Sequence, residues 1–268
     1  MIRDITIGQY YPVDSVIHRL DPRVKLVGTL AFIISLFLHR TFLMYLVAAL
    51  FLGAVIKASK VPFSFMIKGL KAIMVLLMIT VVFNMILTPG TPLIRIWKIT
   101  VTVEGVGQAA FMAIRLAFLI VGSSVMTLTT TPNNLTDGME KGLAPLNKLH
   151  VPVHEVAMMM SIALRFIPIL LEETDKIMKA QQARGADFDS GNLIQKAKSL
   201  VPLLVPLFIS AFRRANDLAM AMEARGYRGG EGRTKMKPLV YKKQDKMAYG
   251  ILAAYLLCMI LVGKFAPF

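Results

Sequence analysis

Two segments of the chain end in the same tripeptide, Ala-Arg-Gly, and these two copies are the clearest candidate for function in the sequence. They are Ala183-Arg184-Gly185 and Ala224-Arg225-Gly226, and they lie 41 residues apart. Glycine commonly ends an α-helix, and a cation in the last turn suits the negative end of the helix dipole. Helix capping therefore explains the glycine, but it does not require the same alanine and arginine twice. Since arginine offers a planar, permanently charged fork to a carboxylate, the pair also suits a partner with two similar grooves.

The sequence lacks the common patterns of catalysis and cofactor binding. It contains no G-x-x-x-x-G-K-[ST] loop for ATP phosphates and no H-E-x-x-H zinc motif. His150 and His154 are four residues apart, but Pro152 between them disrupts a shared helical ligand face. A single cysteine, Cys258, excludes an internal disulfide and a multi-cysteine metal site. We therefore expect a chain that is not an enzyme and that has no catalytic residue, metal or cofactor of its own.

Composition assigns the chain to the membrane class. Hydrophobic residues make up 56% of the 268 residues, and the mean hydropathy is +0.61. The net charge of +15 could also suit a nucleic-acid binder, but the apolar residues gather in long runs, which such a protein does not need. In a membrane protein the same excess serves the positive-inside bias and contacts with anionic lipid headgroups. We expect the lipid bilayer as a partner, and no nucleic acid.

The apolar runs predict an all-α integral membrane protein with about five transmembrane helices. The expected spans lie near Val24–Leu38, Phe42–Ile56, Ala72–Leu87, Gly105–Leu128 and Met247–Val262. Arg115 is the exceptional charge within them, and we expect it to reach the interface or to pair with Glu104. A carrier that moves ions or protons by itself usually has more charges inside its spans.

Loop charges predict the orientation of the spans. Arginine and lysine are frequent in the N-terminal arm and the second loop, and residues 132–246 carry 18 of them. The other loops contain only Arg40 on one side and Arg95 with Lys98 on the other. The positive-inside rule therefore predicts a bacterial plasma-membrane protein with a cytoplasmic N-terminus and an extracellular C-terminus. The N-terminal arm has no apolar signal core, so the first span is expected to direct insertion.

Two further apolar stretches, Val156–Leu171 and Leu200–Phe212, lie within the basic region. If both crossed the bilayer, the orientation of the other loops would not change. However, the second stretch is too short to span, Arg165 would be costly inside the first, and their connection would place several lysines outside. We therefore expect long cytoplasmic helices that are apolar on one face.

Local signals predict where these helices begin and end. Thr131 followed by Pro132 is typical of a helix start. A second helix is expected from about Val153 to Gly185, and a third from about Asn192 to Gly226. The predicted domains are residues 1–131 (arm and four spans), 132–246 (cytoplasmic coupling helices, ending in a solvated linker) and 247–268 (last span).

Three motifs together resemble the T component of energy-coupling factor transporters, which are ABC-type importers of vitamins. They are the twin Ala-Arg-Gly ends, the segment Ser15-Val16-Ile17-His18-Arg19-Leu20-Asp21-Pro22-Arg23-Val24-Lys25, and Leu164-Arg165-Phe166-Ile167-Pro168. The resemblance covers nearly the whole chain. It implies that Arg184 and Arg225 dock into two ATP-binding cassette ATPase subunits, which bind ATP and Mg²⁺. It also implies that a separate membrane-embedded S component captures the substrate.

The methionines bear on how many S components one chain could serve. Met158, Met159 and Met160 follow one another on a predicted coupling helix, where they are either ordinary packing or an adaptable surface shared by several S components. Two alternatives stay open. One is a T component dedicated to a single S component, for a vitamin or a transition metal. The other is a secondary carrier acting alone, against which the scarcity of intramembrane charge argues.

Overall fold

The structure is a computed structural model that describes residues 10–38, 41–96, 99–186, 188, 192–230, 236 and 238–265. The chain divides into two compact units. One contains residues 10–141 and 239–265, and we call it the bundle unit. The other contains residues 142–238, and we call it the crossed-helix unit. The chain thus passes between the units twice, after Lys141 and after Pro238.

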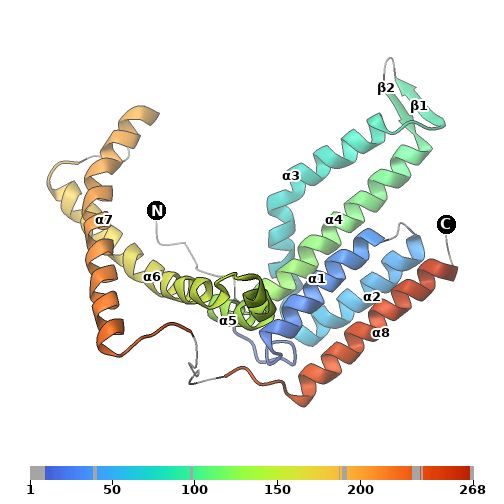
Figure 1. Cartoon of the computed structure of the whole chain (residues 1–268). Coiled ribbons are helices and arrows are strands. Elements are labelled where there is room, and N and C mark those ends of the chain that lie inside the picture. The colour runs from blue at the N-terminus through green and yellow to red at the C-terminus, as the bar shows by residue number, and fades with distance from the viewer. Residues whose placement is uncertain are drawn as a thin grey trace. The chain divides into compact units, whose positions relative to one another are not determined.

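The bundle unit is built on four apolar helices that lie side by side (Figure 1). They are α1 (Pro22–Leu38), α2 (Phe42–Ser59), α4 (Val103–Thr129) and α8 (Lys243–Phe265). Large apolar side chains from all four form the buried core. Tyr255 of α8 stacks on Phe51 with ring centroids 4.2 Å apart, and its hydroxyl lies 2.7 Å from the Ser35 hydroxyl. Helix α4 approaches α1 closely at Gly122, where a Cβ atom would lie only 2.7 Å from the ring of Phe32.

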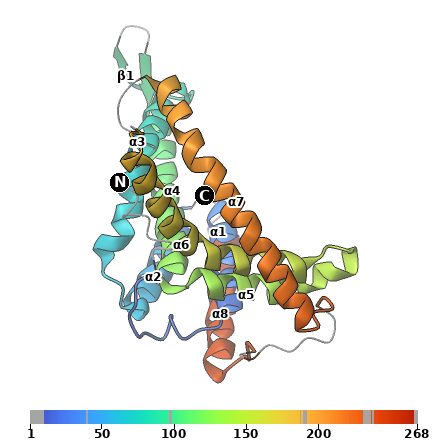
Figure 2. The same cartoon turned by 90° about the vertical axis from the view of Figure 1, so that its left-hand side faces the viewer.

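Helix α3 (Phe63–Leu87) packs along α4, and a two-stranded antiparallel sheet connects the two. The strands are β1 (Pro92–Ile96) and β2 (Ile99–Thr102), and both views show them at the same end of α3 and α4 (Figure 2). The sequence prediction contained no strand here, because the β-branched residues are few and lie between two much stronger apolar runs. The Thr102 side chain ends the hairpin and caps α4 by accepting a hydrogen bond from the Gly105 N–H.

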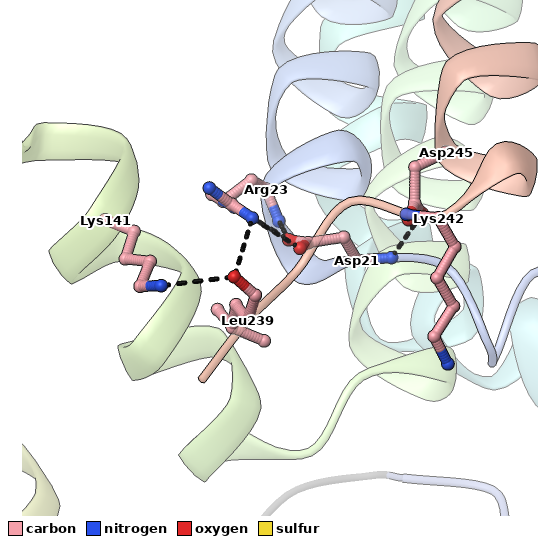
Figure 3. Close-up of polar contacts among 6 residues, drawn as sticks. All are labelled: Asp21, Arg23, Lys141, Leu239, Lys242 and Asp245. Atoms are coloured by element: carbon pink, nitrogen blue, oxygen red, sulfur yellow. Dashed lines mark hydrogen bonds and ion pairs between the residues drawn. The ribbon is translucent and has the colours of Figure 1, made fainter. Parts of the chain in front are cut away.

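The Asp245 carboxylate joins the beginnings of two helices that are remote in sequence (Figure 3). It is 2% exposed and accepts the Asp21 N–H at 2.8 Å and the Lys242 N–H at 2.7 Å. Asp21 directly precedes α1, and Lys242 directly precedes α8. Since helix N-termini carry unpaired N–H groups and partial positive charge, one buried carboxylate stabilises both.

The crossed-helix unit contains α6 (Val153–Ala183) and α7 (Leu193–Ala224), preceded by the 3₁₀ helix η1 (Ala144–Leu149). The short helix α5 (Pro132–Leu143) leads into it from the bundle unit. The predicted start of α5 is confirmed, because the Thr131 hydroxyl accepts the Asn134 N–H at 3.3 Å. The predicted bounds of the two long helices are confirmed to within one or two residues.

Both long helices end in the same backbone arrangement, a Schellman cap. Gly185 and Gly226 adopt positive φ angles of 89° and 70°, and their N–H groups bond back to Gln182 and Glu223. The N–H of the following residue bonds one residue further back in each case, from Ala186 to Gln181 and from Tyr227 to Met222. Glycine is thus needed at both positions for the backbone alone, whereas the cap makes no use of the arginine side chain.

The predicted all-α fold is confirmed, since each of the five expected spans is helical. Among the described residues, α2, α4, α6 and α8 are long and apolar enough to cross a membrane, and Ile73–Leu87 of α3 is a shorter apolar stretch. Helix α3 starts nine residues before the predicted span, because the helix continues into the polar segment that precedes its apolar run. The apolar part of α6 satisfies length and hydropathy for a span, so its expected place outside the bilayer stays a prediction.

Replacing Asp245 with alanine should destabilise the bundle unit. The change leaves two buried N–H groups without their charged acceptor, which we expect to cost about 3 kcal/mol. Denaturant unfolding of the purified protein in detergent micelles measures the difference. The matched control is Asp217→Ala, which removes an exposed carboxylate on α7 and should change the free energy of unfolding by less than about 0.5 kcal/mol. Equal effects of the two substitutions would contradict the double cap.

The glycines at the two helix ends should tolerate alanine poorly. Gly185→Ala or Gly226→Ala forces a Cβ atom into the left-handed region, at a cost of about 1 kcal/mol each. Hydrogen exchange should show the last turn of the affected helix opening more readily. Gly142→Ala serves as the control, because Gly142 lies in α5 with open space around it, and alanine should leave that helix unchanged or more stable. Faster exchange in all three variants would count against this account of the caps.

Candidate functional site

Helices α6 and α7 are joined by an ion pair between Glu173 and Arg214. The Arg214 guanidinium donates to the Glu173 carboxylate at 3.2 Å. Both side chains are about a third exposed, so the pair contributes modestly to stability, but it marks where the helices meet. Figures 1 and 2 show the two helices crossing.

Contacts on both sides of this ion pair show that the helices run antiparallel. Towards the end of α6, the Gln181 side chain donates to the Pro202 carbonyl near the start of α7 at 3.3 Å. Towards the start of α6, Ile162 and Phe166 line a cavity of about 300 Å³ together with Met222 from the end of α7. The C-terminal ends of the two helices therefore lie at opposite ends of the seam.

The two Ala-Arg-Gly ends are placed symmetrically about the ion pair. Arg184 follows Glu173 by 11 residues, and Arg225 follows Arg214 by the same number. At 1.5 Å per residue, each arginine lies roughly 16 Å beyond the crossing, and the antiparallel directions separate the two by roughly 30 Å. The pair cannot converge on one small ligand. Their spacing suits two separate binding pockets on a large partner.

All six residues of the two ends are exposed. Within the described part of the chain, neither the Arg184 nor the Arg225 guanidinium has a hydrogen-bond or ion-pair partner. A guanidinium presents five N–H donors in a planar fork, and carboxylates and phosphates bind it through two parallel bonds. Each end is therefore a cationic tip carried on a rigid helix and open to an acidic partner.

The crossed-helix unit also exposes large apolar side chains. On α7 they recur every three or four residues, as expected for one face of a helix, and on α6 two adjacent methionines are half exposed. The exposed side chains are Leu200, Val201, Leu204, Val205, Phe208, Ile209 and Phe212 of α7, and Met159 and Met160 of α6. A surface of this kind indicates contact with lipid or with another apolar protein surface.

The N-terminal motif contributes to the fold of the bundle unit. The His18 ring lies 2.7 Å from the Ser15 hydroxyl and 3.0 Å from the Tyr11 carbonyl. The Lys25 ammonium is buried and donates to the carbonyls of Thr129 and His18. Because these polar atoms are used within the fold, this motif holds the arm against the helix ends. The third motif, at 164–168, lies in the middle of α6, with Phe166 in the seam.

Arg115 does not pair with Glu104, which was one of the two expectations for it. Its guanidinium donates to the Tyr45 hydroxyl at 2.9 Å and lies 5.3 Å from the ring of Phe37. The Glu104 carboxylate instead accepts the N–H of Thr91 at the end of the hairpin. Arginine is thus held by a phenol and an aromatic face at one position along α4, which differs from a row of charges along a transport path.

Neither the histidines nor the main cavity of the bundle unit forms a polar site. His150 adopts a φ of 60° before α6 begins, so it does not share a helix face with His154. Within the described ranges, no cluster of three His, Cys, Asp or Glu side chains could hold a metal ion. A cavity of about 360 Å³ lies among α1, α2, α4 and α8, and its lining is almost entirely apolar. Such a lining suits hydrocarbon rather than a polar vitamin.

Sequence analysis found the tips but missed the contacts that position them. The Glu173–Arg214 ion pair has a weak signal in the sequence, since opposite charges precede the two arginines by the same number of residues. The Asp21–Asp245 contact has no local signal, because 224 residues separate the partners.

Comparison with known proteins agrees with this architecture. A family model described as the cobalt transport protein CbiQ matches residues 14–236. The energy-coupling factor transporter transmembrane protein EcfT of Clostridium kluyveri is 57% identical over 98% of both chains. The corresponding EcfT proteins of Bacillus subtilis and Lactococcus lactis are 50% and 44% identical, over 91% and 98% of this chain.

These likenesses extend through both units, and they include the segments that carry the two arginine tips. Together with the apolar helices, they make the chain a multi-pass membrane subunit rather than an isolated soluble domain. The chain belongs to the EcfT family, the transmembrane components of energy-coupling factor transporters.

Proposed function

We infer that this subunit couples ATP hydrolysis by two ATPase subunits to the uptake of a vitamin or similar micronutrient. The ATPases bind ATP and Mg²⁺, and a separate S component binds the substrate. This chain supplies the mechanical connection. The observation that carries the proposal is the pair of exposed arginine tips, Arg184 and Arg225, placed equally far from one helix crossing.

The geometry suits a partner that is itself a pair of similar subunits. A dimer of ATPases presents two equivalent grooves on either side of its axis, as symmetric assemblies do. Two tips roughly 30 Å apart can each enter one groove and meet a carboxylate there. When the ATPases close on ATP, the grooves approach each other, and the crossed helices must follow.

The apolar surface of the crossed-helix unit suits the S component. Its side chains on α7 include Phe208 and Phe212, whose rings also pack on each other at 4.8 Å. Met159 and Met160 of α6 are flexible and polarisable, so this surface can repack against different partners. We infer that one chain of this type serves several S components in turn.

Orientation follows from charge. The tips must face the cytoplasm, where ATP is, and the positive-inside rule gives the basic segment 132–246 the same side. The N-terminus is then cytoplasmic and the C-terminus extracellular.

Reversing both tips tests the proposal. We expect Arg184→Glu with Arg225→Glu to give a stable, membrane-inserted protein that no longer binds the ATPases. Each reversal replaces an arginine–carboxylate contact with repulsion, at a cost of about 3 kcal/mol or more where the contact is buried. Co-purification of the ATPases measures binding. Uptake of radiolabelled riboflavin, by cells that also express a riboflavin-binding S component, measures transport.

The matched control reverses two charges on the same helices away from the tips. Lys179→Glu with Arg213→Glu changes the net charge equally, at exposed positions on α6 and α7. This variant should keep ATPase binding and uptake within about twofold, since exposed charges contribute little. Normal uptake by the tip variant, or equal loss in both variants, would overturn the role of the tips.

A dedicated T component for a transition metal is the second candidate, because the matching family model is described as a cobalt transport protein. The two candidates differ in their partners. Purification of the tagged chain from its native membrane would recover several different S components in the first case and a single metal-specific one in the second.

A further inference from the structure

Both passages of the chain between the two units start from one polar cluster in the bundle unit. Lys141 is the last residue before the chain enters the crossed-helix unit, and Leu239 is the first residue after it returns. The Lys141 ammonium donates to the Leu239 carbonyl at 3.1 Å. The outgoing and returning segments are therefore fastened to each other, although 98 residues separate them in sequence.

The Leu239 carbonyl is held by a second cation from a different helix. The Arg23 guanidinium of α1 donates to the same oxygen at 3.5 Å, while Lys141 reaches it from α5, as Figure 3 shows. Arg23 also lies over the ring of Tyr241, 3.8 Å from its centroid. Two side chains of the bundle unit thus hold the returning segment at residues 239 and 241. We call Lys141, Arg23 and the Leu239 carbonyl the strap clamp.

The clamp is anchored at the beginnings of two membrane helices. Arg23 binds the Asp21 carboxylate through two N–H groups, at 3.0 and 2.7 Å. Burial alone would raise the pKa of the Asp21 carboxyl, but the hydrogen bonds from Arg23 outweigh this and hold the pKa below its ordinary value of 3.8. Asp21 is in turn tied to Asp245 of α8 through its own N–H. The clamp, α1 and α8 therefore form one connected group.

Helix α5 is also fixed against α1 at this place. A Cβ atom on Gly138 would lie 2.7 Å from Cβ of Pro22 and 3.4 Å from the Arg23 nitrogen. The backbones of α5 and α1 are therefore as close as glycine allows, three residues before Lys141. Neither passage has free play at the border of the bundle unit.

The clamp changes what the connection after α7 can do. The 18 residues between Ala224 and Lys243 would otherwise be slack enough to absorb a movement of the crossed helices. With Leu239 and Tyr241 held, the returning segment is fixed to the bundle unit before α8 begins. A pull on this segment then acts directly on the starts of α1 and α8.

We propose that Lys141 and Arg23 are positioning residues for transport, which hold the Leu239 carbonyl so that movement of the crossed helices reaches the membrane helices. This inference rests on the proposed function, because it assumes that ATPases move the crossed helices. It adds that the passage between the units, and not only the tips, determines how much uptake each hydrolysed ATP produces.

The test separates coupling from binding. The chain is reconstituted in liposomes with both ATPases and a riboflavin-binding S component, and ATP hydrolysis and radiolabelled riboflavin uptake are measured together. Lys141→Met removes one donor from the Leu239 carbonyl. We expect ATPase binding and hydrolysis within about twofold of wild type, and uptake per ATP lowered about fivefold to tenfold. Lys141→Arg keeps a charged donor and should restore most of the ratio.

A matched control and a structural readout complete the test. Lys243→Met removes the same charge at the exposed first residue of α8, whose side chain is outside the clamp, and should keep the ratio of the wild type. Hydrogen exchange of the amides of residues 239–242 should rise in Lys141→Met and stay unchanged in Lys243→Met. Exchange reports the clamp even if the Lys141→Met complex transports too little to measure.

Each other outcome decides against the clamp or against its basis. An unchanged uptake ratio with Lys141→Met, or unchanged exchange at 239–242, would overturn the clamp. So would loss of ATPase binding in this variant, because Lys141 would then contribute to docking. If the wild-type chain itself neither binds ATPases nor supports uptake, the proposed function fails. The exchange comparison then still shows whether the clamp exists.

Discussion

The arrangement of the membrane helices depends on one buried carboxylate, that of Asp245. It accepts N–H groups in front of α1 and of α8, and so places the starts of both helices at the same level. Further along, the Ser35 and Tyr255 hydroxyls meet at 2.7 Å and join the same two helices again. Two polar contacts along one pair of helices leave little freedom to slide. The apolar core around Phe32 can then pack in a single register.

The cost of placing charge in hydrocarbon divides the chain into parts with different tasks. The bundle unit keeps its few buried charges paired or hydrogen-bonded, as with Lys25 on backbone carbonyls and Arg115 on Tyr45. The crossed-helix unit presents exposed cations at both helix ends. A transporter subunit of this family therefore combines a membrane anchor with a basic surface for partners.

Much of the fold was predictable because it follows from local patterns. Apolar runs identified all five helices expected to span the membrane, and the glycines at 185 and 226 identified the ends of α6 and α7. The two arginine tips were recognisable as a pair for the same reason. In these segments the helix signals and the hydrophobic pattern agree with each other.

The features that sequence reasoning missed are all set by tertiary contacts. The antiparallel crossing of α6 and α7, the strap clamp and the Asp21–Asp245 contact join residues far apart in the chain, and no local pattern announces them. The hairpin before α4 was missed because it is only two short strands. For α6, length and loop charge favour opposite placements, so one sequence alone does not decide between them.

The distance of 11 residues between the Glu173–Arg214 ion pair and each tip has a geometric consequence. Eleven residues make close to three turns of an α-helix, so each tip arginine lies on the same side of its helix as the ion-pair residue behind it. Neither of these stretches contains proline or glycine, so both behave as stiff arms of one balance beam pivoted at the crossing. A single inserted residue in one arm would swing its arginine by about 100° and lengthen that arm alone. Two matched sockets on a symmetric partner could then no longer be filled together, so the arms can change length only as a pair.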